Sequence, residues 1–110
     1  MTRRPAESRR APAAAALLAI LLATGGAAAQ DAENGLRLAR VWCVGCHLVE
    51  PGGGTSDVAP AFELIADNPA LTDERLRGWL TAPHPPMPDL SLSQPEISDL
   101  VAYIASLRGD

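Results

Sequence analysis

The chain has 110 residues, of which 47% are hydrophobic and 20% are charged, and it contains four aromatic residues, two cysteines and two histidines. This length accommodates one domain and excludes a two-lobed enzyme or an array of repeats. Much of the hydrophobic content is alanine, and residues 11–29 alone contain ten alanines. We therefore expect the folded domain to be shorter than the chain.

The first thirty residues show the order of regions typical of a secretory signal peptide. Four arginines lie within the first ten residues, and residues 13–23 carry no charge. A glycine pair follows, and the alanines at 27–29 offer an A-x-A cleavage site. The apolar stretch is well short of the ~20 residues that cross a bilayer, so a retained anchor is the less favoured alternative. We predict an ordinary Sec signal peptide at 1–30, which is cleaved, and a mature domain at 31–110.

Cleavage changes the charge balance. Residues 31–110 keep five arginines against twelve acidic residues, a formal net charge of −7, and lysine is absent. Such a domain lacks the basic surface that displaces counterions from nucleic acid, and anionic lipid head groups repel it. We expect no nucleic-acid partner and no stable membrane insertion after cleavage.

The pattern of the mature segment predicts helices and loops without a strand, an all-α domain. Asp31 is the expected N-cap of a first helix over about residues 32–45, whose apolar face consists of Gly35, Leu38, Ala39, Trp42 and Cys46. Three glycines at 52–54 end this unit in a loop. A short helical turn is expected over residues 62–66, after Pro60.

Two further helices are expected towards the C-terminus. Thr72 is a suitable N-cap for a helix with an apolar stripe at Leu76, Trp79 and Leu80. Four prolines between 83 and 88 exclude regular structure around Met87. Ser93 and Glu96 then form an S-x-x-E capping box. The last helix has the clearest apolar face, made of Ile97, Leu100, Val101, Ile104 and Leu107.

The large apolar side chains of the mature segment are too few for a secure core. Its aromatic residues are Trp42, Phe62, Trp79 and Tyr103. Domains of about 80 residues usually need an additional constraint. A disulfide between cysteines three positions apart closes too short a loop to contribute much. The composition favours a bound group inside the domain.

Both cysteines and one histidine lie within the pentapeptide Cys43-Val44-Gly45-Cys46-His47. C-x-x-C-H is typical of a c-type haem attachment site. Residues i and i+3 share one face of a helix, so the two thiols can reach the two vinyl groups on one porphyrin edge while His47 binds the iron. A thioredoxin-like dithiol leaves His47 unexplained, a disulfide stabilises little, and a zinc site has only these three ligands and the distant His84.

The second axial ligand of such an iron has two candidates. Met87 is the only methionine of the mature segment and lies in a proline-rich loop, where packing alone gives it little reason to be. Ligation by His47 and Met87 would raise the reduction potential and suit electron transfer. His84 is the alternative ligand, or a solvent-facing loop residue that titrates near neutral pH.

At this point the chain resembles a bacterial class I (monohaem) cytochrome c over nearly all of residues 31–110. The matching segments are Asn34-Gly35, the C-x-x-C-H pentapeptide, Ala59-Pro60, Met87-Pro88 and Asp99 to Leu107. The resemblance implies a cytochrome c fold, with three to five helices and long loops around one covalently bound haem c.

The resemblance also assigns roles to individual residues. It implies that Gly35 and Tyr103 lie where the N- and C-terminal helices cross, and that the Pro60 carbonyl accepts a hydrogen bond from His47. Trp79 packs on the haem or bonds a propionate, or is a plain core aromatic. The chain departs from the family pattern at Ala39, where an aromatic is frequent, and in lacking a ring of lysines.

The function that these features favour is a periplasmic one-electron carrier. It would have no catalytic residues, and it would exchange electrons with redox partner proteins as a monomer or as a subunit of a redox complex. The absent lysines leave those partners undefined, and Arg75 and Arg77 are the available local positive charges. A haem-based peroxidase or gas sensor with a dissociable Met87, or a small haem subunit of a larger oxidoreductase, is the alternative.

Overall fold

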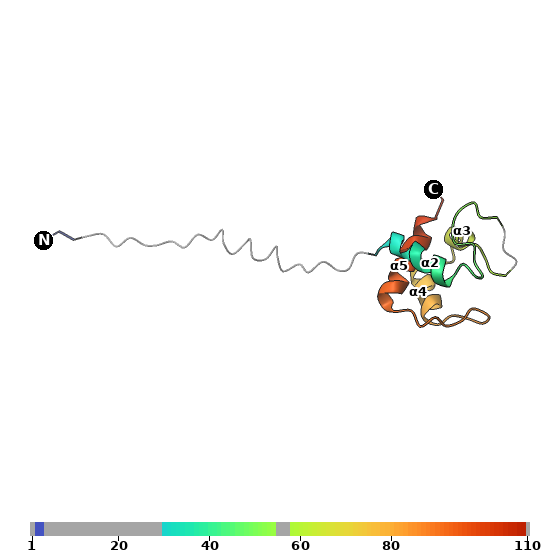
Figure 1. Ribbon diagram of the computed structural model, residues 1–110. Coiled ribbons are helices and arrows are strands. Elements are labelled where there is room, and N and C mark those ends of the chain that lie inside the picture. The colour runs from blue at the N-terminus through green and yellow to red at the C-terminus, as the bar shows by residue number, and fades with distance from the viewer. Residues whose placement is uncertain (1, 4–29, 55–57, 110) are drawn as a thin grey trace.

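The structure is a computed structural model that describes residues 2–3, 30–54 and 58–109. In these ranges it has no strand and four helices: α2 (Ala32–Trp42), α3 (Phe62–Asp67), α4 (Asp73–Thr81) and α5 (Gln94–Ser106) (Figure 1). The all-α prediction is confirmed for the part of the chain described. The expected signal peptide lies outside the described residues except at positions 2, 3 and 30. None of the described helices combines the length and the apolarity that crossing a membrane requires.

The start of α2 follows the sequence prediction, but its end comes three residues early. The Asp31 side chain caps the helix by accepting a hydrogen bond from the Asn34 backbone N–H at 3.0 Å. At the other end the Ala39 carbonyl accepts from both Cys43 and Val44, at 2.9 and 3.1 Å. The second of these bonds spans five residues, a geometry that closes a helix rather than extending it.

The apolar face expected for the first helix is partly wrong. Its buried stripe runs through Gly35, Ala39 and Cys43, every fourth residue. Trp42 lies beside this stripe, and 56% of its surface is exposed. A period of four therefore describes the packed face better than the mixed three- and four-residue spacing that included Trp42.

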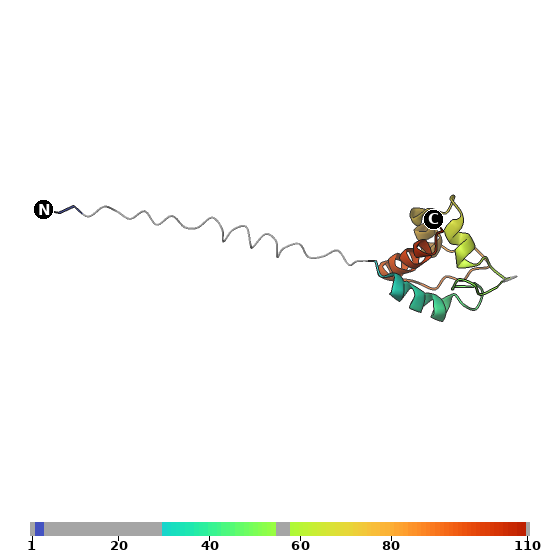
Figure 2. The same cartoon turned by 90° about the horizontal axis from the view of Figure 1, so that it is seen from above.

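Helix α5 is the centre of the domain, and its largest contact is with α2 (Figure 2). The capping box predicted at its start is present, because the Ser93 hydroxyl accepts from the Glu96 backbone and the Glu96 carboxylate accepts from the Ser93 backbone. Four of the five residues of its predicted face are buried, and Leu107 is half-buried. The fully buried side chains of the core include Ile97, Leu100 and Val101.

Gly35 permits the close crossing of α2 and α5. A Cβ atom at this position would lie 2.0 Å from the Asp99 carbonyl oxygen and 2.8 Å from the Tyr103 Cβ. The start of α2 is also bonded to α5, because the Asp99 carboxylate accepts from the Asp31 backbone N–H at 2.8 Å and from the Asn34 amide at 2.7 Å. The helix crossing implied by the family resemblance is therefore present.

Helices α3 and α4 pack on α5 with smaller contacts. The expected turn at 62–66 is α3, one residue longer than predicted. Thr72 caps α4 by accepting from the Arg75 backbone N–H at 3.3 Å, as predicted. Leu76 is buried, but Trp79 keeps 47% of its surface exposed. The alternative in which Trp79 is a plain core aromatic is wrong, because this residue lies at the edge of the packed face of α4.

Candidate functional site

The C-x-x-C-H pentapeptide forms a tight helical turn directly after α2. The Cys43 carbonyl accepts hydrogen bonds from the backbone N–H groups of Cys46 at 3.1 Å and His47 at 2.9 Å. Cys43 is buried in the hydrophobic core, whereas Cys46 is exposed. One short turn therefore presents two thiols and an imidazole, with the first thiol in the core and the second at the surface.

No disulfide joins the two cysteines, and the burial of Cys43 keeps its thiol from acting as an attacking thiolate. Burial raises the pKa of Cys43 to about 11, so this thiol stays protonated at neutral pH. A dithiol oxidoreductase relies instead on an accessible thiolate with a lowered pKa. Burial thus rules out Cys43 as the attacking thiolate of such a site.

The His47 ring is oriented by the loop that follows the pentapeptide. Its Nδ1 lies 2.6 Å from the Pro60 carbonyl oxygen, the hydrogen bond that the resemblance implies. A carbonyl oxygen only accepts, so Nδ1 carries a proton and donates, and in the neutral imidazole Nε2 is then the nitrogen that can bind a metal. The ring is half-buried, with its centroid 5.3 Å from that of Phe62.

The three residues after His47 are held by contacts that the sequence did not indicate. The Leu48 carbonyl accepts from the Phe62 backbone N–H at 2.9 Å, and the Val49 carbonyl accepts from the Tyr103 hydroxyl at 2.5 Å. The Glu50 carboxylate pairs with Arg40 of α2. The partners in these contacts are 10 to 54 positions apart in sequence, and their spacings follow no regular repeat. A local sequence pattern therefore does not predict them.

The remaining predicted site residues form a second group around the loop after α4. The ring centroids of Trp79 and His84 lie 4.4 Å apart in an edge-on arrangement. The His84 carbonyl accepts from the Met87 backbone N–H at 2.9 Å, and Met87 is half-buried. The structure therefore brings Cys43, Cys46, His47 and Pro60 together in one group, and Trp79, His84 and Met87 in another.

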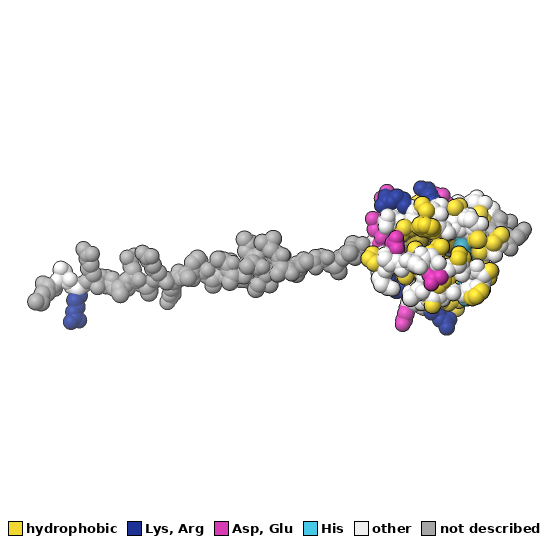
Figure 3. All heavy atoms as spheres, turned by 60° about the horizontal axis from the view of Figure 1, so that its bottom comes forward, with side chains coloured by type: hydrophobic (Ala, Val, Ile, Leu, Met, Phe, Trp, Pro, Cys, Tyr) yellow, Lys and Arg dark blue, Asp and Glu magenta, His cyan; other side chains and the backbone are white. Residues whose placement is uncertain are grey.

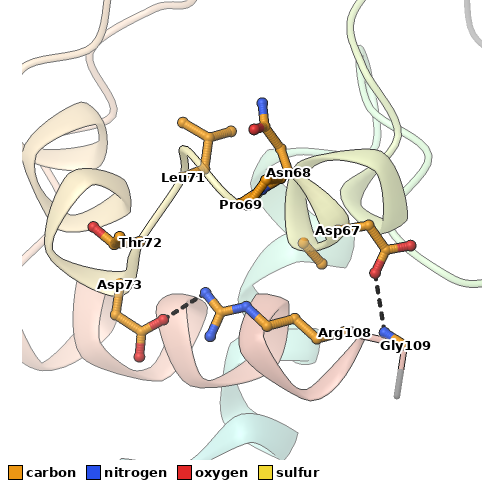
Figure 4. A pocket seen from close by; sticks show the side chains of 9 residues that line it. Asp67, Asn68, Pro69, Leu71, Thr72, Asp73, Arg108 and Gly109 are labelled. Carbon is orange, nitrogen blue, oxygen red and sulfur yellow. Dashed lines mark hydrogen bonds and ion pairs between the residues drawn. The ribbon is translucent and has the colours of Figure 1, made fainter.

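Two surface pockets involve other parts of the domain. One lies between the end of α3, the start of α4 and the C-terminal residues, where Arg108 pairs with Asp73 at 2.6 Å and the Gly109 backbone N–H bonds Asp67 at 3.0 Å (Figure 4). The other lies along α4 and includes Trp79. The pentapeptide residues Cys43, Cys46 and His47 line neither pocket.

The donor set fits a covalently attached haem. Two cysteine side chains outside any disulfide lie on one turn, and the imidazole beside them is held through Nδ1. In Figure 3 hydrophobic side chains gather over one face of the domain with a histidine visible among them, and charged side chains lie mainly around the margin. A covalently attached haem would use this combination, with the thiols bonded to the porphyrin, the imidazole on the iron and apolar surface against the macrocycle.

Comparison with known proteins finds a relative that aligns with most of the chain. The chain is 40% identical over 93 residues to cytochrome c-552 of Bradyrhizobium diazoefficiens, an alignment that covers 84% of this chain and 89% of that protein. No protein-family model matches the chain. No solved structure matches it.

Proposed function

The chain belongs to the bacterial monohaem c-type cytochromes, and from that premise we propose that it carries single electrons between partner proteins in the periplasm, with His47 and Met87 as its axial ligands. Membership of this family makes it an electron-transfer protein rather than an enzyme, with covalently bound haem c as its cofactor. The observation that carries the proposal is the orientation of His47, whose Nδ1 lies 2.6 Å from the Pro60 carbonyl.

The pentapeptide supplies the attachment points in this proposal. Cys43 and Cys46 form the two thioethers, and His47 offers Nε2 to the iron. The Pro60 carbonyl keeps the imidazole in one tautomer and makes it a more basic ligand. The haem supplies the reversible one-electron chemistry when it is bound. The protein's part is to hold the ligands in place in both oxidation states, so that little reorganises on reduction.

Met87 is favoured over His84 as the second axial ligand. The His84 ring already contacts Trp79, and its backbone carbonyl closes the turn that ends at Met87. The prolines around Met87 restrict the loop before any bond to iron forms, so a weak iron–sulfur bond need not order it. Trp79 contacts the ring of His84 in the same loop. We propose that this contact holds Trp79 on the side of the loop that faces the bound haem.

The charge of the mature segment bears on its partners. Arg40 and Arg108 both form ion pairs within the domain, and Arg77 donates to Ser98 at 2.8 Å. The surface therefore presents mainly acidic groups, which complement a redox partner with a basic docking face. Electron-transfer encounters bury little surface and dissociate quickly.

The proposal also includes export of the chain from the cytoplasm. Residues 1–30 act as a cleaved signal peptide, and residues 31–110 are the mature domain. Haem c is attached outside the cytoplasm, so an exported precursor and a C-x-x-C-H motif point to the same compartment.

The test begins with the full chain, produced together with haem-attachment machinery. We expect haem that stays on the polypeptide under denaturing conditions, a low-spin spectrum and the weak methionine–iron charge-transfer band. Met87→Ala should abolish that band and lower the midpoint potential. His84→Ala is the matched control from the same loop and should retain the band.

Two results would contradict the proposal. A Met87→Ala protein with an unchanged spectrum would assign the ligand to His84. Rapid stoichiometric binding of carbon monoxide to the ferrous wild-type protein at neutral pH would show an open iron and favour a peroxidase or gas sensor.

A further inference from the structure

The chain immediately after the pentapeptide is fixed at four consecutive residues, which we call the 47–50 segment. His47 Nδ1 bonds the Pro60 carbonyl at 2.6 Å, and the Leu48 carbonyl accepts from Phe62 at 2.9 Å. The Val49 carbonyl accepts from the Tyr103 hydroxyl, and the Glu50 carboxylate pairs with Arg40. The contacts of Val49 and Glu50 come from α5 and α2, and those of His47 and Leu48 come from the 60–62 region. A stretch of irregular chain is thereby attached to three parts of the domain.

Of these contacts, the bond from Tyr103 is a buried link between the segment and α5. Only 6% of the Tyr103 surface is exposed, and its hydroxyl reaches the Val49 carbonyl at 2.5 Å. The Arg40–Glu50 pair lies at the surface, with 53% and 49% of the two side chains exposed, so water screens it. A buried carbonyl that loses its donor has no water to replace it, and the segment must then move to find another partner.

Tyr103 also supports the His47 ring through its own ring. The Tyr103 and Phe62 centroids are 6.3 Å apart, and the Phe62 and His47 centroids are 5.3 Å apart. Both spacings are within the range of tilted aromatic pairs. Tyr103 therefore acts on the imidazole by two routes, one through the backbone of Val49 and one through the ring of Phe62.

The position of Tyr103 on α5 makes it a rigid support. Its Cβ packs against the backbone of Gly35, where α2 and α5 cross most closely. Burial, aided by the negative charge of Glu50, raises the pKa of the Tyr103 hydroxyl, so the group remains a neutral donor through the physiological range. The close crossing of α2 and α5 is thus connected to the loop that carries His47.

We propose that Tyr103 is a positioning residue for His47, and that its hydroxyl, by holding the Val49 carbonyl, keeps His47 Nδ1 on the Pro60 carbonyl and so helps to set the reduction potential. The inference rests on the proposed ligation of iron by His47. Donation from Nδ1 increases the basicity of the ligand and stabilises ferric iron. A loosened 47–50 segment weakens that donation, so the midpoint potential rises.

The experiment compares Tyr103→Phe with Ser98→Ala in the haem-loaded protein. The first variant keeps the ring and removes the hydroxyl. The second variant removes the hydroxyl of Ser98, which is also on α5. This hydroxyl accepts a hydrogen bond from Arg77 of α4 at 2.8 Å. We expect Tyr103→Phe to raise the midpoint potential and to make the His47 Nδ1 proton exchange with solvent about two- to tenfold faster, the factor expected for one lost hydrogen bond. Ser98→Ala should change neither.

Glu50→Gln provides a second probe that leaves the core intact. It weakens the surface attachment of the same segment and should speed the exchange of the His47 Nδ1 proton less than Tyr103→Phe does. The exchange rate is the measure compared here, because loss of the Glu50 charge itself raises the potential. A larger increase in exchange rate with Glu50→Gln would overturn the assignment to Tyr103. So would a Tyr103→Phe protein with the potential and exchange rate of Ser98→Ala. A wild-type protein without histidine ligation would refute the proposed function itself, and its spectrum distinguishes that outcome from a failure of this inference alone.

Discussion

Replacing Gly35 by alanine tests the helix crossing on which the domain depends. The new Cβ would lie 2.0 Å from the Asp99 carbonyl oxygen, 2.6 Å from the Asp99 carbonyl carbon and 2.8 Å from the Tyr103 Cβ. A carbon–oxygen contact requires about 3.3 Å, so α2 and α5 must separate by roughly 1.3 Å. No side-chain rotation relieves the contact, because the obstructing atoms belong to the backbone or are attached directly to it.

The size of the effect follows from two opposing terms. Overpacking of this kind costs about 1–3 kcal/mol and occasionally more, and backbone obstruction puts this site at the upper end. Alanine returns up to about 1 kcal/mol of helix propensity relative to glycine. We expect Gly35→Ala to lower the free energy of unfolding by about 2 kcal/mol or more.

Gly78 supplies the matched control, because it also lies inside a helix. A Cβ at Gly78 in α4 meets no atom within 4 Å, so only the propensity gain remains. Gly78→Ala should therefore stabilise the protein, by up to about 1 kcal/mol. Urea unfolding of the haem-loaded proteins, followed by circular dichroism with the slope checked for constancy, measures both variants. The reasoning fails if Gly35→Ala stays within about 0.5 kcal/mol of the wild type, the range of ordinary surface substitutions.

Three further predictions concern caps and charges. Ser93→Ala removes the capping-box hydroxyl of α5 and should cost about 1 kcal/mol in the same unfolding assay, whereas an unchanged midpoint would mean the cap is dispensable. Hydrogen bonds from Asn34 and the Asp31 backbone lower the pKa of the Asp99 carboxyl, so its stabilising contribution is complete above the unfolded value of about 3.9 and is lost as pH falls through the folded pKa. Unfolding of Asp99→Asn between pH 6 and 2 should accordingly show a flatter loss of stability than wild type, and parallel curves would contradict this. Arg108→Gln should change the free energy of unfolding by less than about 1 kcal/mol, because the ion pair of Arg108 with Asp73 is well exposed. A larger loss would show that the pocket between α3, α4 and the C-terminal residues has a structural role.

The features that could be predicted from sequence are the ones that depend on neighbouring residues. The caps at Asp31, Thr72 and Ser93 each use an oxygen that reaches an N–H three residues ahead, so the sequence contains both partners. The apolar face of α5 is likewise a matter of spacing within one helix. The C-x-x-C-H pentapeptide is predictable for the same reason, because all its donors lie within one turn.

The features that could not be predicted depend on how distant elements meet. The three- and four-residue spacing from Leu38 and Ala39 predicts a packed Trp42. Helix α2 instead faces α5 along the stripe that contains Ala39, and Trp42 lies outside it. The edge-on contact of Trp79 with His84 depends on the path of the turn after α4. The prolines of this turn limit its conformations, but they do not determine which one it adopts. The bond from Tyr103 to Val49 joins residues 54 positions apart, and no pattern in either segment indicates it.

The distribution of the four aromatic residues links stability to the proposed redox site. Trp42 and Trp79 keep about half of their surface exposed, whereas Phe62 and Tyr103 are buried and form the chain of rings that ends at His47. In a domain with so few large side chains, two residues of the core, Phe62 and Tyr103, are thus also the ones proposed to position His47. Substitutions at the α2–α5 crossing should consequently alter the reduction potential together with the free energy of unfolding, whereas substitutions that weaken only the contact between α4 and α5 should alter stability alone.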